Sequence, residues 1–450
     1  MCAVVIVRRI LGSARNPAQF VVGAFVVVIL LGAVLLRLPI AADEGSLSWH
    51  DSLFWSTSAT TITGLVTVDI SAFSLFGELV LLALMQVGGF GIMTIGSVMA
   101  LIVSRRVGLR QRMLARAEIG AIDIGELRSL ILAIARITLV FELLVAVVLF
   151  VDVMARDDGV GAGRAAYSAA FHGVSAFNNA GISLYSDSLA QFATDPIVIL
   201  AITIAFIVGG LGFPILVELQ HRVRPRRWSL HTKITLLATA VLLVVGPLVM
   251  LTFEWSNPAT LGPMNVWEKV QVAWFQGTTP RSAGFTMIDI GAQREPTLLI
   301  TTGLMFIGAG PASTSGGIKV TTFALLGFAM WSEVRGDEDI NVFRRRIPVH
   351  VARQAMTVAL ISVGVVFLTG IALNGMSRFG FTHTLFESAS AFGTSGLSTG
   401  ITDALPTVGQ VLLMLVMLAG RVGPITLVTA LALRDRSRAY RFAEERPIIG

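Results

Sequence analysis

Four short segments that each carry a glycine in a similar setting recur along this chain, at intervals of 117, 103 and 112 residues. The segments are ATTITGL with Gly64, AFNNAGI with Gly181, TPRSAGF with Gly284 and AFGTSGL with Gly396. Four equivalent loops in one polypeptide can surround a single axis. Their backbone carbonyl oxygens can then replace the water around a dehydrated cation, which is the chemistry of an ion pore. The spacing therefore predicts one unit that is used four times.

The composition indicates the solvent around the elements that must position these loops. Hydrophobic residues make up 54% of the 450 residues and charged residues only 14%, and the mean hydropathy is +0.78. These values are typical of an integral membrane protein. Eight apolar stretches are long enough to cross a hydrocarbon core of about 30 Å, which gives two crossings per unit. They lie over 20–36, 79–103, 129–151, 197–217, 234–253, 297–331, 355–373 and 407–433.

Between the two crossings of each unit lies a shorter, half-polar segment that ends at a glycine loop. These segments cover 52–63, 167–180, 268–283 and 384–395. Each is too short and too rich in Ser and Thr to span, so we expect a re-entrant helix and loop that face a common aqueous path. The predicted fold is an all-α membrane protein of eight transmembrane helices, in four helix–pore-loop–helix repeats around one pseudo-fourfold pore. The predicted repeats are 1–104, 105–221, 222–341 and 342–450, and the last includes a cytoplasmic C-terminus.

Arginine is concentrated in the connections between repeats and near both ends of the chain. The residues are Arg8, Arg9, Arg15, Arg105, Arg106, Arg110, Arg112, Arg116, Arg222, Arg224, Arg226, Arg227, Arg344, Arg345, Arg346, Arg434, Arg436, Arg438 and Arg441. The positive-inside rule makes this side cytoplasmic, together with both termini, in a multi-pass plasma-membrane protein. This topology explains the net charge of +6 without any nucleic-acid partner.

The glycine loops then open outward, where an acidic mouth would concentrate cations. An aspartate follows each glycine by five to seven residues, and further carboxylates lie in the outer connections. The residues are Asp43, Glu44, Asp69, Asp157, Asp158, Asp187, Asp289 and Asp403.

The second helix of the third repeat contains the interruption GAGPASTSGGIK, over 308–319. Such a run cannot stay helical against lipid, so it must face protein or the water path. Its place in the helix lies just beneath the glycine loops, and we favour an intramembrane gate over a simple kink. The predicted gate residues are Gly310, Pro311, Ser313, Thr314, Ser315, Gly316, Gly317 and Lys319, together with Arg421 of the fourth repeat.

Arg421 occupies the position that is Gly89, Gly210 and Ala309 in the other repeats. A guanidinium is too costly to face lipid, so it either projects toward the axis or pairs with a buried carboxylate such as Glu142. On the axis it would limit cation occupancy below the filter or bond to carbonyls of the 308–319 segment. The neighbouring glycines in the first two repeats are best explained by close helix packing, since small residues let helices approach. They are Gly88, Gly89, Gly91, Gly209, Gly210 and Gly212.

Taken together, the four glycine motifs, the 308–319 segment, GRVGP at 420–424 and LHTKI at 230–234 resemble the Trk/Ktr/HKT superfamily of potassium transporters. The resemblance covers the chain from the first span to residue 433 and is strongest to the bacterial Ktr-type membrane subunit. It implies potassium (K+) uptake, with K+ bound by a filter in which each glycine acts with the residue before it. These residues are Thr63, Gly64, Ala180, Gly181, Ala283, Gly284, Ser395 and Gly396.

The resemblance also implies a homodimer in the lipid bilayer with one pore per subunit, and a cytoplasmic nucleotide-binding ring as regulatory partner. No cofactor is expected beyond the transported K+, with Na+ as a possible activator. Gly64 stands where relatives that pass sodium can carry serine, and this favours potassium. Polar side chains of Thr63, Asn178, Ser282 and Ser395 either hold the loops or only cap the short helices.

Two other classes of protein were weighed against a pore. An enzyme is disfavoured because the chain has no GxxxxGK[ST] phosphate loop and no HExxH pair, and Cys2, its single cysteine, excludes a cysteine-based metal cluster. An ion-coupled secondary cation transporter with alternating access is a closer rival, because such proteins use broken helices. It is disfavoured by repeats of the same orientation and by the absence of a midplane pattern of carboxylates.

Overall fold

A computed structural model describes residues 17–43, 45–112, 124–156, 159, 161–221 and 224–423. The described chain is mainly helical, with one small hairpin. Its elements are α2 (Pro17–Leu36), α3 (Trp49–Thr61), α4 (Leu75–Arg112), α5 (Ile124–Ala155), α6 (Ala162–Phe177), α7 (Pro196–Leu211), α8 (Phe213–His221), α9 (Leu230–Glu254), α10 (Val266–Thr278), α11 (Glu295–Phe306), α12 (Val320–Arg335), β1 (Ile340–Val342), β2 (Arg345–Ile347), α13 (Val349–Met376), α14 (Phe381–Gly393) and α15 (Thr407–Val422).

Several of these helices begin at polar residues that satisfy the first free backbone N–H groups. The Ser48 hydroxyl accepts a hydrogen bond from the backbone of Asp51 at the start of α3. Asp195 accepts from two backbone amides at the start of α7, which has Pro196 as its first residue. The start of α10 is a capping box between Asn265 and Glu268. These capping residues therefore fix the residue at which each of these helices begins.

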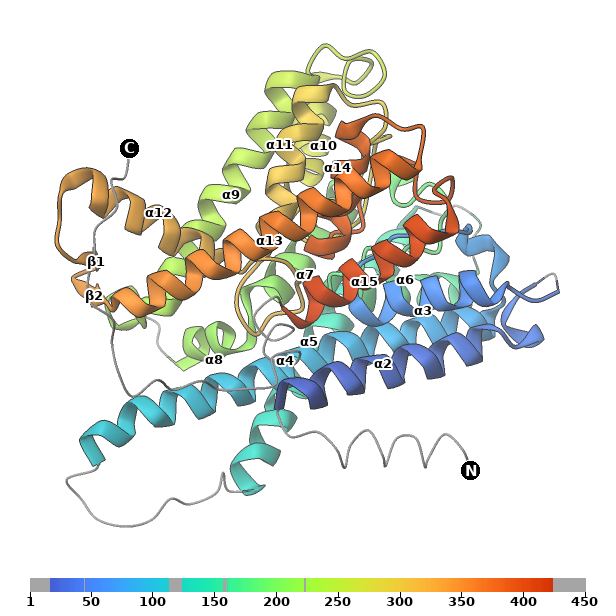
Figure 1. The fold of residues 1–450 in the computed structure, drawn as a ribbon. Coiled ribbons are helices and arrows are strands. Elements are labelled where there is room, and N and C mark those ends of the chain that lie inside the picture. Colours follow the sequence, from blue (N-terminus) through green and yellow to red (C-terminus); the bar gives the residue numbers. More distant parts are fainter. Residues whose placement is uncertain are drawn as a thin grey trace.

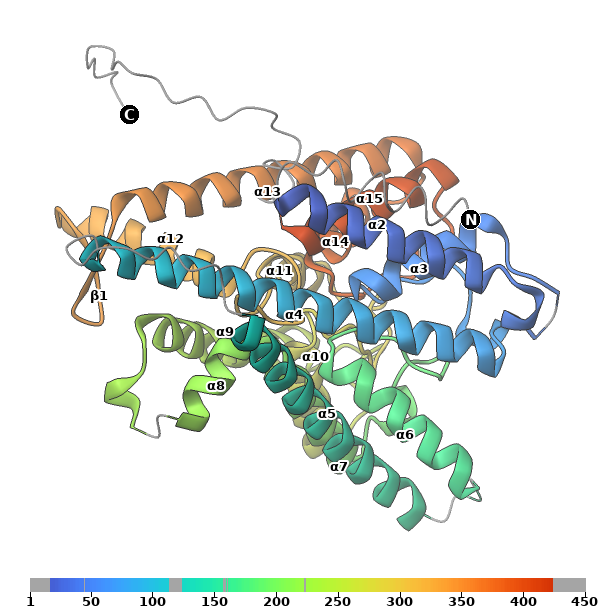
Figure 2. The ribbon, with the colours of Figure 1, turned by 90° about the horizontal axis from the view of Figure 1, so that it is seen from below.

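Each of the four short helices α3, α6, α10 and α14 packs against the long helix that precedes it in the chain, which is α2, α5, α9 or α13. Figure 2 shows α3 beside α2 and α6 beside α5, and Figure 1 shows α10 beside α9. The last described helix, α15, packs against α3 near the beginning of the chain. The chain therefore closes on itself around a central region.

The described helices agree in part with the eight predicted crossings. Three are long and apolar enough to span a bilayer: the part of α5 over Ser129–Ala155, α9 and α13. The pair α7 and α8 would make a fourth if it is counted as one span. The shorter apolar helices Val21–Leu36, Leu75–Gly91 and Thr407–Val422 overlap three further predicted stretches. The arrangement is that of a multi-pass membrane protein, and the count of eight stays a prediction.

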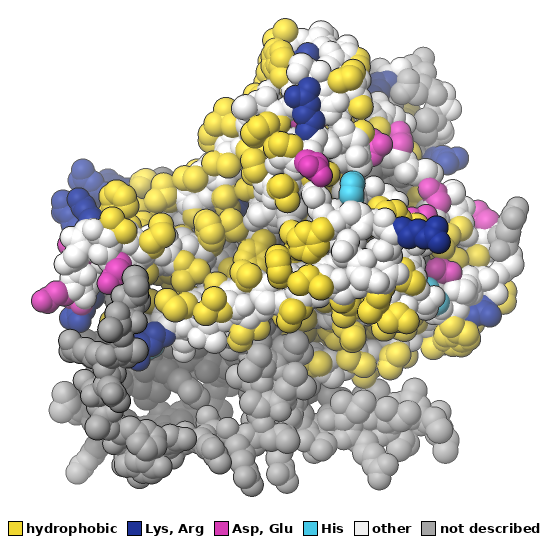
Figure 3. Space-filling model, turned by 45° about the horizontal axis from the view of Figure 1, so that its top comes forward, with side chains coloured by type: hydrophobic (Ala, Val, Ile, Leu, Met, Phe, Trp, Pro, Cys, Tyr) yellow, Lys and Arg dark blue, Asp and Glu magenta, His cyan; other side chains and the backbone are white. Residues whose placement is uncertain are grey.

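The outer surface of the long helices agrees with a lipid environment. Leu143 on α5 is 66% exposed, and Leu360 and Leu368 on α13 are each 68% exposed. Figure 3 shows many hydrophobic side chains among the other atoms of the described part of this face. Apolar surface on this scale indicates contact with a membrane or with another protein.

The interruption predicted at 308–319 lies between α11, which ends at Phe306, and α12, which begins at Val320. The sequence treats 197–217 as one continuous crossing, and that detail is wrong. The chain bends by 99° between α7 and α8 at Gly212, whose φ of 93° is outside the range of ordinary helical residues. The apolar residues around Gly212 give no sign of this break, because the sequence does not distinguish a glycine at a helix-packing contact from a glycine at which a helix ends.

The hairpin of β1 and β2 was not predicted, because its two strands have only three residues each. It pairs Ile340 with Ile347 and lies between α12 and α13. Several predicted features lie outside the described residues. These are both chain termini, the arginines at 8, 9, 15, 116, 222 and 434–441, and the acidic residues Glu44, Asp157 and Asp158.

Candidate ion pathway

The four glycines stand just after the C-terminal ends of the four short helices, as the sequence predicted for re-entrant segments. All four have positive φ, between 66° and 87°. The residue two positions before each glycine also has positive φ, although none of these residues is a glycine. They are Ile62, Asn179, Ser282 and Thr394. Because this conformation is strained for non-glycine residues, and most of all for Ile and Thr, its fourfold recurrence marks one specific loop shape.

The four loops meet in a closed ring. A Cβ atom added to each glycine would come within 2.8 Å of the carbonyl oxygen of the residue before the glycine of the next loop. The pairs follow chain order and return to the start: Gly64 with Ala180, Gly181 with Ala283, Gly284 with Ser395, and Gly396 with Thr63. Only glycine leaves room for so close an approach of backbone to backbone. The eight residues predicted to bind K+ are therefore gathered at one place.

Hydrogen bonds between loops fix part of this ring. The Ser282 hydroxyl donates to the carbonyl of Gly393 at 2.8 Å, and the Ser395 hydroxyl donates to the carbonyl of Pro280 at 3.1 Å. These two bonds join the third and fourth loops in both directions. For Ser282 and Ser395, the interpretation that polar side chains hold the loops is confirmed. Thr63 bonds instead to Thr61 of its own loop.

The Asn178 side chain anchors the second loop to two residues of other helices. Its amide donates to the Glu142 carboxylate at 2.9 Å and to the Gln86 carbonyl at 3.0 Å. Glu142 lies on α5 and is 5% exposed, and it also accepts from Gln86 at 3.2 Å. The possible pairing of Glu142 with Arg421 is therefore not observed, because Glu142 is held by two amides.

A second set of bonds joins each short helix to the chain segment that leaves its glycine. Glu387 on α14 is fully buried and accepts from Ser398 at 2.6 Å, from the Thr399 amide at 2.9 Å and from Thr402 at 2.8 Å. His172 on α6 contacts Ser183 at 3.0 Å in the same way. The sequence analysis missed both residues. Each of the two is a titratable residue nine positions before one of the four glycines, and this shared spacing could have identified them. The sequence pattern instead placed both within half-polar segments.

The aspartates that follow the glycines are all exposed. Asp69 accepts hydrogen bonds from the Ser71 backbone and from the Ser186 hydroxyl of the second loop's outer segment, at 2.8 and 3.0 Å. Partial burial alone would raise the pKa of Asp69, but the bonds from Ser71 and Ser186 outweigh it and lower that pKa below its usual value. Asp69 is therefore charged at neutral pH, in agreement with a negative outer mouth.

The segment between α11 and α12 lies directly against the ring. Three consecutive residues in it bond to three different loops, each through the strained residue two positions before a glycine. Asn179 donates to the Thr314 hydroxyl at 2.5 Å. Ser315 donates to the Ser282 hydroxyl at 2.8 Å, and the Gly316 amide donates to the Thr394 hydroxyl at 3.0 Å. In the first loop this position is Ile62, whose side chain cannot form a hydrogen bond.

The same segment is tied to the helix break between α7 and α8 beside it. The Gly310 amide donates to the Gly210 carbonyl at 2.8 Å, and the amide of Phe213 donates to the Ala312 carbonyl at 3.2 Å. Pro311 lies so close that its carbonyl oxygen would collide with a side chain at Gly212. The break between α7 and α8 therefore makes room for the segment.

Other predicted gate residues brace the segment from within and from α15. Ser313 donates to the Gly310 carbonyl at 2.6 Å, and Lys319 donates to the Ser315 carbonyl at 2.5 Å. The Gly317 amide donates to the Gly420 carbonyl at 3.3 Å. Residues 313–318 are buried. All the predicted gate residues on this segment are thus in one compact structure beneath the ring.

Arg421 is 4% exposed and joins this structure from α15. Its guanidinium donates to the carbonyl of Thr314 and, at 3.1 Å, to the carbonyl of Gly88. Of the alternatives considered for Arg421, the structure shows the bond to a carbonyl of the 308–319 segment. Gly88 and Gly209 pack as expected, because a side chain at either would overlap a carbonyl oxygen at the end of a short helix, and Gly420 packs in the same way. The packing explanation is wrong for Gly91, where an added Cβ would meet no atom within 4 Å.

A ring of backbone carbonyls with a buried segment beneath it is the geometry of a cation path, and sequence comparison agrees. The chain matches the family described as TrkH, cation transport protein, over residues 9–440. It is 39% identical over 423 residues to the Ktr system potassium uptake protein B of Bacillus subtilis, covering 94% of both chains.

The chain belongs to the TrkH family of cation transport proteins. Within this family it is of the bacterial Ktr type, which confirms the resemblance seen in the motifs. The family is one of transporters rather than enzymes. Other relatives are the Ktr system potassium uptake protein B of Vibrio alginolyticus, 36% identical over 95% of this chain and 93% of that protein, and the potassium/sodium uptake protein NtpJ of Enterococcus hirae, 30% identical over 99% of this chain and 100% of that protein.

The TrkH fold is also recognised in three dimensions. The crystal structure of the potassium transporter TrkH from Vibrio parahaemolyticus aligns with a TM-score of 0.75, at 18% identity, over 94% of this chain and 86% of that one. At this identity the match establishes the fold alone. The fold is thus that of a membrane transporter.

Proposed function

We propose that this protein takes up potassium across the plasma membrane through a channel-like pore. The proposal rests above all on one observation, the closed ring in which each glycine abuts the carbonyl of the next loop. Four carbonyls that face one centre can take the place of the water around a cation, and they favour an ion of one size and charge. Two relatives of the chain are potassium uptake proteins, and they supply potassium as that ion.

The filter in this proposal consists of the four glycines and the residues before them. Its four loops belong to four repeats, 1–104, 105–221, 222–341 and 342–450, each with a helix, a pore loop and a second helix. Eight spans with both termini in the cytoplasm follow from this division and from the arginine-rich connections. Support comes from the strained conformation that recurs two residues before every glycine.

The segment 308–319 is the gate in this proposal, and Arg421 holds it closed. The bonds of residues 314, 315 and 316 to three loops of the ring support a closed state. Opening requires these bonds and the two Arg421 bonds to break together. A cytoplasmic nucleotide-binding ring acting on a membrane homodimer would supply the energy, as expected for a Ktr-type subunit, and Na+ would act as an activator.

An ion-coupled transporter with alternating access is the second candidate, and one observation favours it. The helix breaks at Gly212 and at 307–319 face each other and exchange backbone hydrogen bonds, as the broken helices of secondary transporters do. In such a transporter the two breaks would bind ions in alternation. The two candidates differ in whether potassium moves alone.

Ion-resolved flux in liposomes separates these candidates. The purified full chain is reconstituted with and without a co-purified cytoplasmic subunit, and K+, Na+ and H+ fluxes are measured under imposed gradients. A pore gives K+ flux that follows the K+ gradient and voltage alone. Flux that requires a Na+ or H+ gradient supports the coupled transporter, and equal Na+ and K+ flux contradicts a potassium filter.

A further inference from the structure

Three buried ionisable side chains lie next to the loops of the ring, and neither the proposed filter nor the proposed gate uses them. Glu142 on α5 is 5% exposed, Glu387 on α14 is fully buried, and Arg281, in the third loop, is 8% exposed. Ionisable groups are costly within a membrane, so a buried one there is a candidate for a functional role. Their place beside the ring suggests a role in how it holds a cation.

The two carboxylates accept hydrogen bonds from neutral groups. Every donor to Glu142 and Glu387 described above is a hydroxyl or an amide. Such donors can hold a carboxylate in place, but they carry no opposite charge. Within the part of the chain that the structure describes, neither carboxylate forms an ion pair with a lysine or an arginine. On the described chain, the ring thus has two acidic neighbours that no basic side chain neutralises.

The two carboxylates lie at opposite sides of the ring. The loops follow one another around it in chain order, so the second faces the fourth. Glu142 is bonded to Asn178, three residues before the glycine of the second loop, and Glu387 is bonded to Ser398, two residues after the glycine of the fourth. At about 3.5 Å per residue, these offsets are at most about 11 and 7 Å. Both carboxylates are therefore close enough to act on a cation at the centre.

Arg281 brings a charge of the opposite sign to the third loop. It stands three residues before the glycine, which is the place of Asn178 in the second loop. Among the described residues, its guanidinium bonds only to the carbonyl and the hydroxyl of Thr239 on α9, at 3.4 and 3.5 Å, and its Nε atom has no partner. No acidic side chain of the described chain forms an ion pair with it. Its positive charge is thus as little compensated as the two negative charges.

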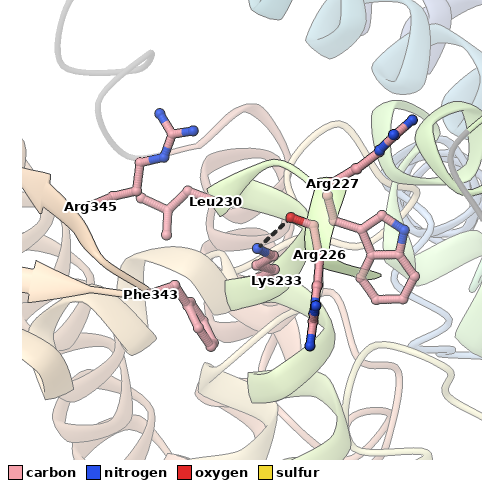
Figure 4. A pocket seen from close by; sticks show the side chains of 7 residues that line it. Arg226, Arg227, Leu230, Lys233, Phe343 and Arg345 are labelled. Atoms are coloured by element: carbon pink, nitrogen blue, oxygen red, sulfur yellow. Dashed lines mark hydrogen bonds between the residues drawn. The ribbon is translucent and has the colours of Figure 1, made fainter. Parts of the chain in front are cut away.

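Surface charges cannot act in the same way, because salt at physiological ionic strength screens them over about 8 Å. The clearest surface group lines an opening of about 480 Å³ between the start of α9 and the β1–β2 hairpin. Figure 4 shows the guanidinium groups of Arg226, Arg227 and Arg345 directed away from one another, and Lys233 donates to the Arg226 carbonyl at 3.4 Å. Arg226 and Arg345 are exposed, so either can serve as a control for the buried charges.

We propose that Glu142, Glu387 and Arg281 set the affinity of the ring for potassium, with the two carboxylates raising it and the arginine lowering it. The inference rests on the proposed function, because it requires a cation at the centre of the ring. Over about 15 Å, at an effective dielectric constant of about 20, Coulomb's law gives one charge an effect of about 6-fold on the binding of a monovalent ion. The gate residues Lys319 and Arg421 add positive charge beneath the ring, and they are the same in every variant below.

The potassium dependence of flux tests the proposal on the full-length protein in liposomes. The measured quantity is the K+ concentration that gives half-maximal flux. Glu142→Gln and Glu387→Gln should each raise this concentration about 6-fold, because each removes one attractive charge. Arg281→Gln should lower it by the same factor, because it removes a repulsive charge.

Inhibition by barium separates an effect of charge from an effect of loop shape. Ba2+ has nearly the same radius as K+ but twice its charge, so its Coulomb energy in the ring doubles and the fold-change is squared. The Ba2+ concentration that halves the flux should rise about 40-fold in Glu142→Gln and in Glu387→Gln, and it should fall as much in Arg281→Gln. A change in the shape of a loop has no reason to follow this square.

Matched variants control for lost hydrogen bonds and for charge elsewhere. Glu142→Asp and Arg281→Lys keep the charge and should stay close to the wild-type K+ and Ba2+ values. Glu254→Gln removes a fully buried carboxylate, but its donor nearest in sequence to a filter glycine is the Arg294 amide, ten residues after the glycine of the third loop. Arg345→Gln removes an exposed charge. The last two variants should leave both values unchanged.

Four results would overturn the proposal. Equal factors for K+ and Ba2+ would assign the effect to loop shape. A shift in the same direction for Arg281→Gln and for the two glutamate variants would rule out their charges as the cause. Unchanged values in all three variants would show that these side chains carry no charge that the ion feels. Wild-type K+ flux that Ba2+ does not reduce would contradict the ring of the proposed function itself, and this inference with it.

Discussion

Thr394→Val is the most direct perturbation of the closed gate that we propose. Thr394 is fully buried, and its hydroxyl accepts a hydrogen bond from the Gly316 amide at 3.0 Å. Among the described residues, that amide has no other acceptor. Valine has nearly the same shape and the same branched Cβ, so the strained backbone at this position should tolerate it equally. The variant therefore removes one bond of the closed state and little else.

The size of the effect follows from burial of that amide. A buried N–H group without a partner costs about 1–3 kcal/mol, whereas water can satisfy it when the segment moves into an open path. The closed state should lose that much relative to the open state, which shifts the gating equilibrium about 5- to 150-fold. Potassium flux should rise by a similar factor until the gate is open most of the time.

The assay is potassium flux into liposomes, normalised to the amount of reconstituted protein. Thr384→Val is the matched control, because Thr384 is equally buried on α14 but its hydroxyl bonds, among the described residues, only to the Phe381 carbonyl of its own helix. The control should leave flux unchanged. The reasoning is refuted if Thr394→Val changes flux no more than Thr384→Val does, or if it lowers flux with normal protein amount.

Three further predictions test the filter, the gate and its support. Gly64→Ser should lower the ratio of potassium to sodium flux, because a side chain there would collide with the Ala180 carbonyl and widen the ring. The control Gly45→Ser, at another positive-φ glycine with open space around it, should leave the ratio unchanged. An unchanged ratio for Gly64→Ser argues against this filter. Deletion within 311–316 should raise flux, and a fall in flux with normal expression would mean that the segment is structural. Glu387→Gln should lower the temperature of unfolding by several degrees, because an amide nitrogen would face a donor that now bonds to a carboxylate oxygen; an unchanged midpoint would show that these bonds add no stability.

The ring of glycine loops and the interruption at 308–319 could be predicted because each depends on residues that are close together in the sequence. A glycine after a half-polar segment signals a loop that only glycine allows, and a run such as GAGPASTSGGIK cannot be helical in lipid. Arg421 was also readable, since a guanidinium in an apolar helix needs polar partners. Its partners proved to be backbone carbonyls of the predicted segment and of Gly88.

The remaining features depend on contacts between distant parts of the chain. Ile62, Asn179, Ser282 and Thr394 share one strained conformation but no common side-chain chemistry, so no pattern connects them. Their bonds to residues 314–316 exist only after the four loops have met. The break at Gly212 was hidden for the same reason, because its purpose is to make room for Pro311. The sequence indicates where the backbone must adopt an unusual conformation, but the residues that it contacts there depend on how distant segments pack.

The central claim is that the carbonyls of Thr63, Ala180, Ala283 and Ser395 surround a potassium ion. Its most direct test is a crystal structure of the protein grown with rubidium or thallium in place of potassium, in which anomalous scattering locates the ion. The ring requires a peak on its axis, within coordination distance of these four carbonyl oxygens, that weakens when sodium replaces the heavier ion. A structure in which the ordered ion lies elsewhere, with the ring empty, would contradict the claim.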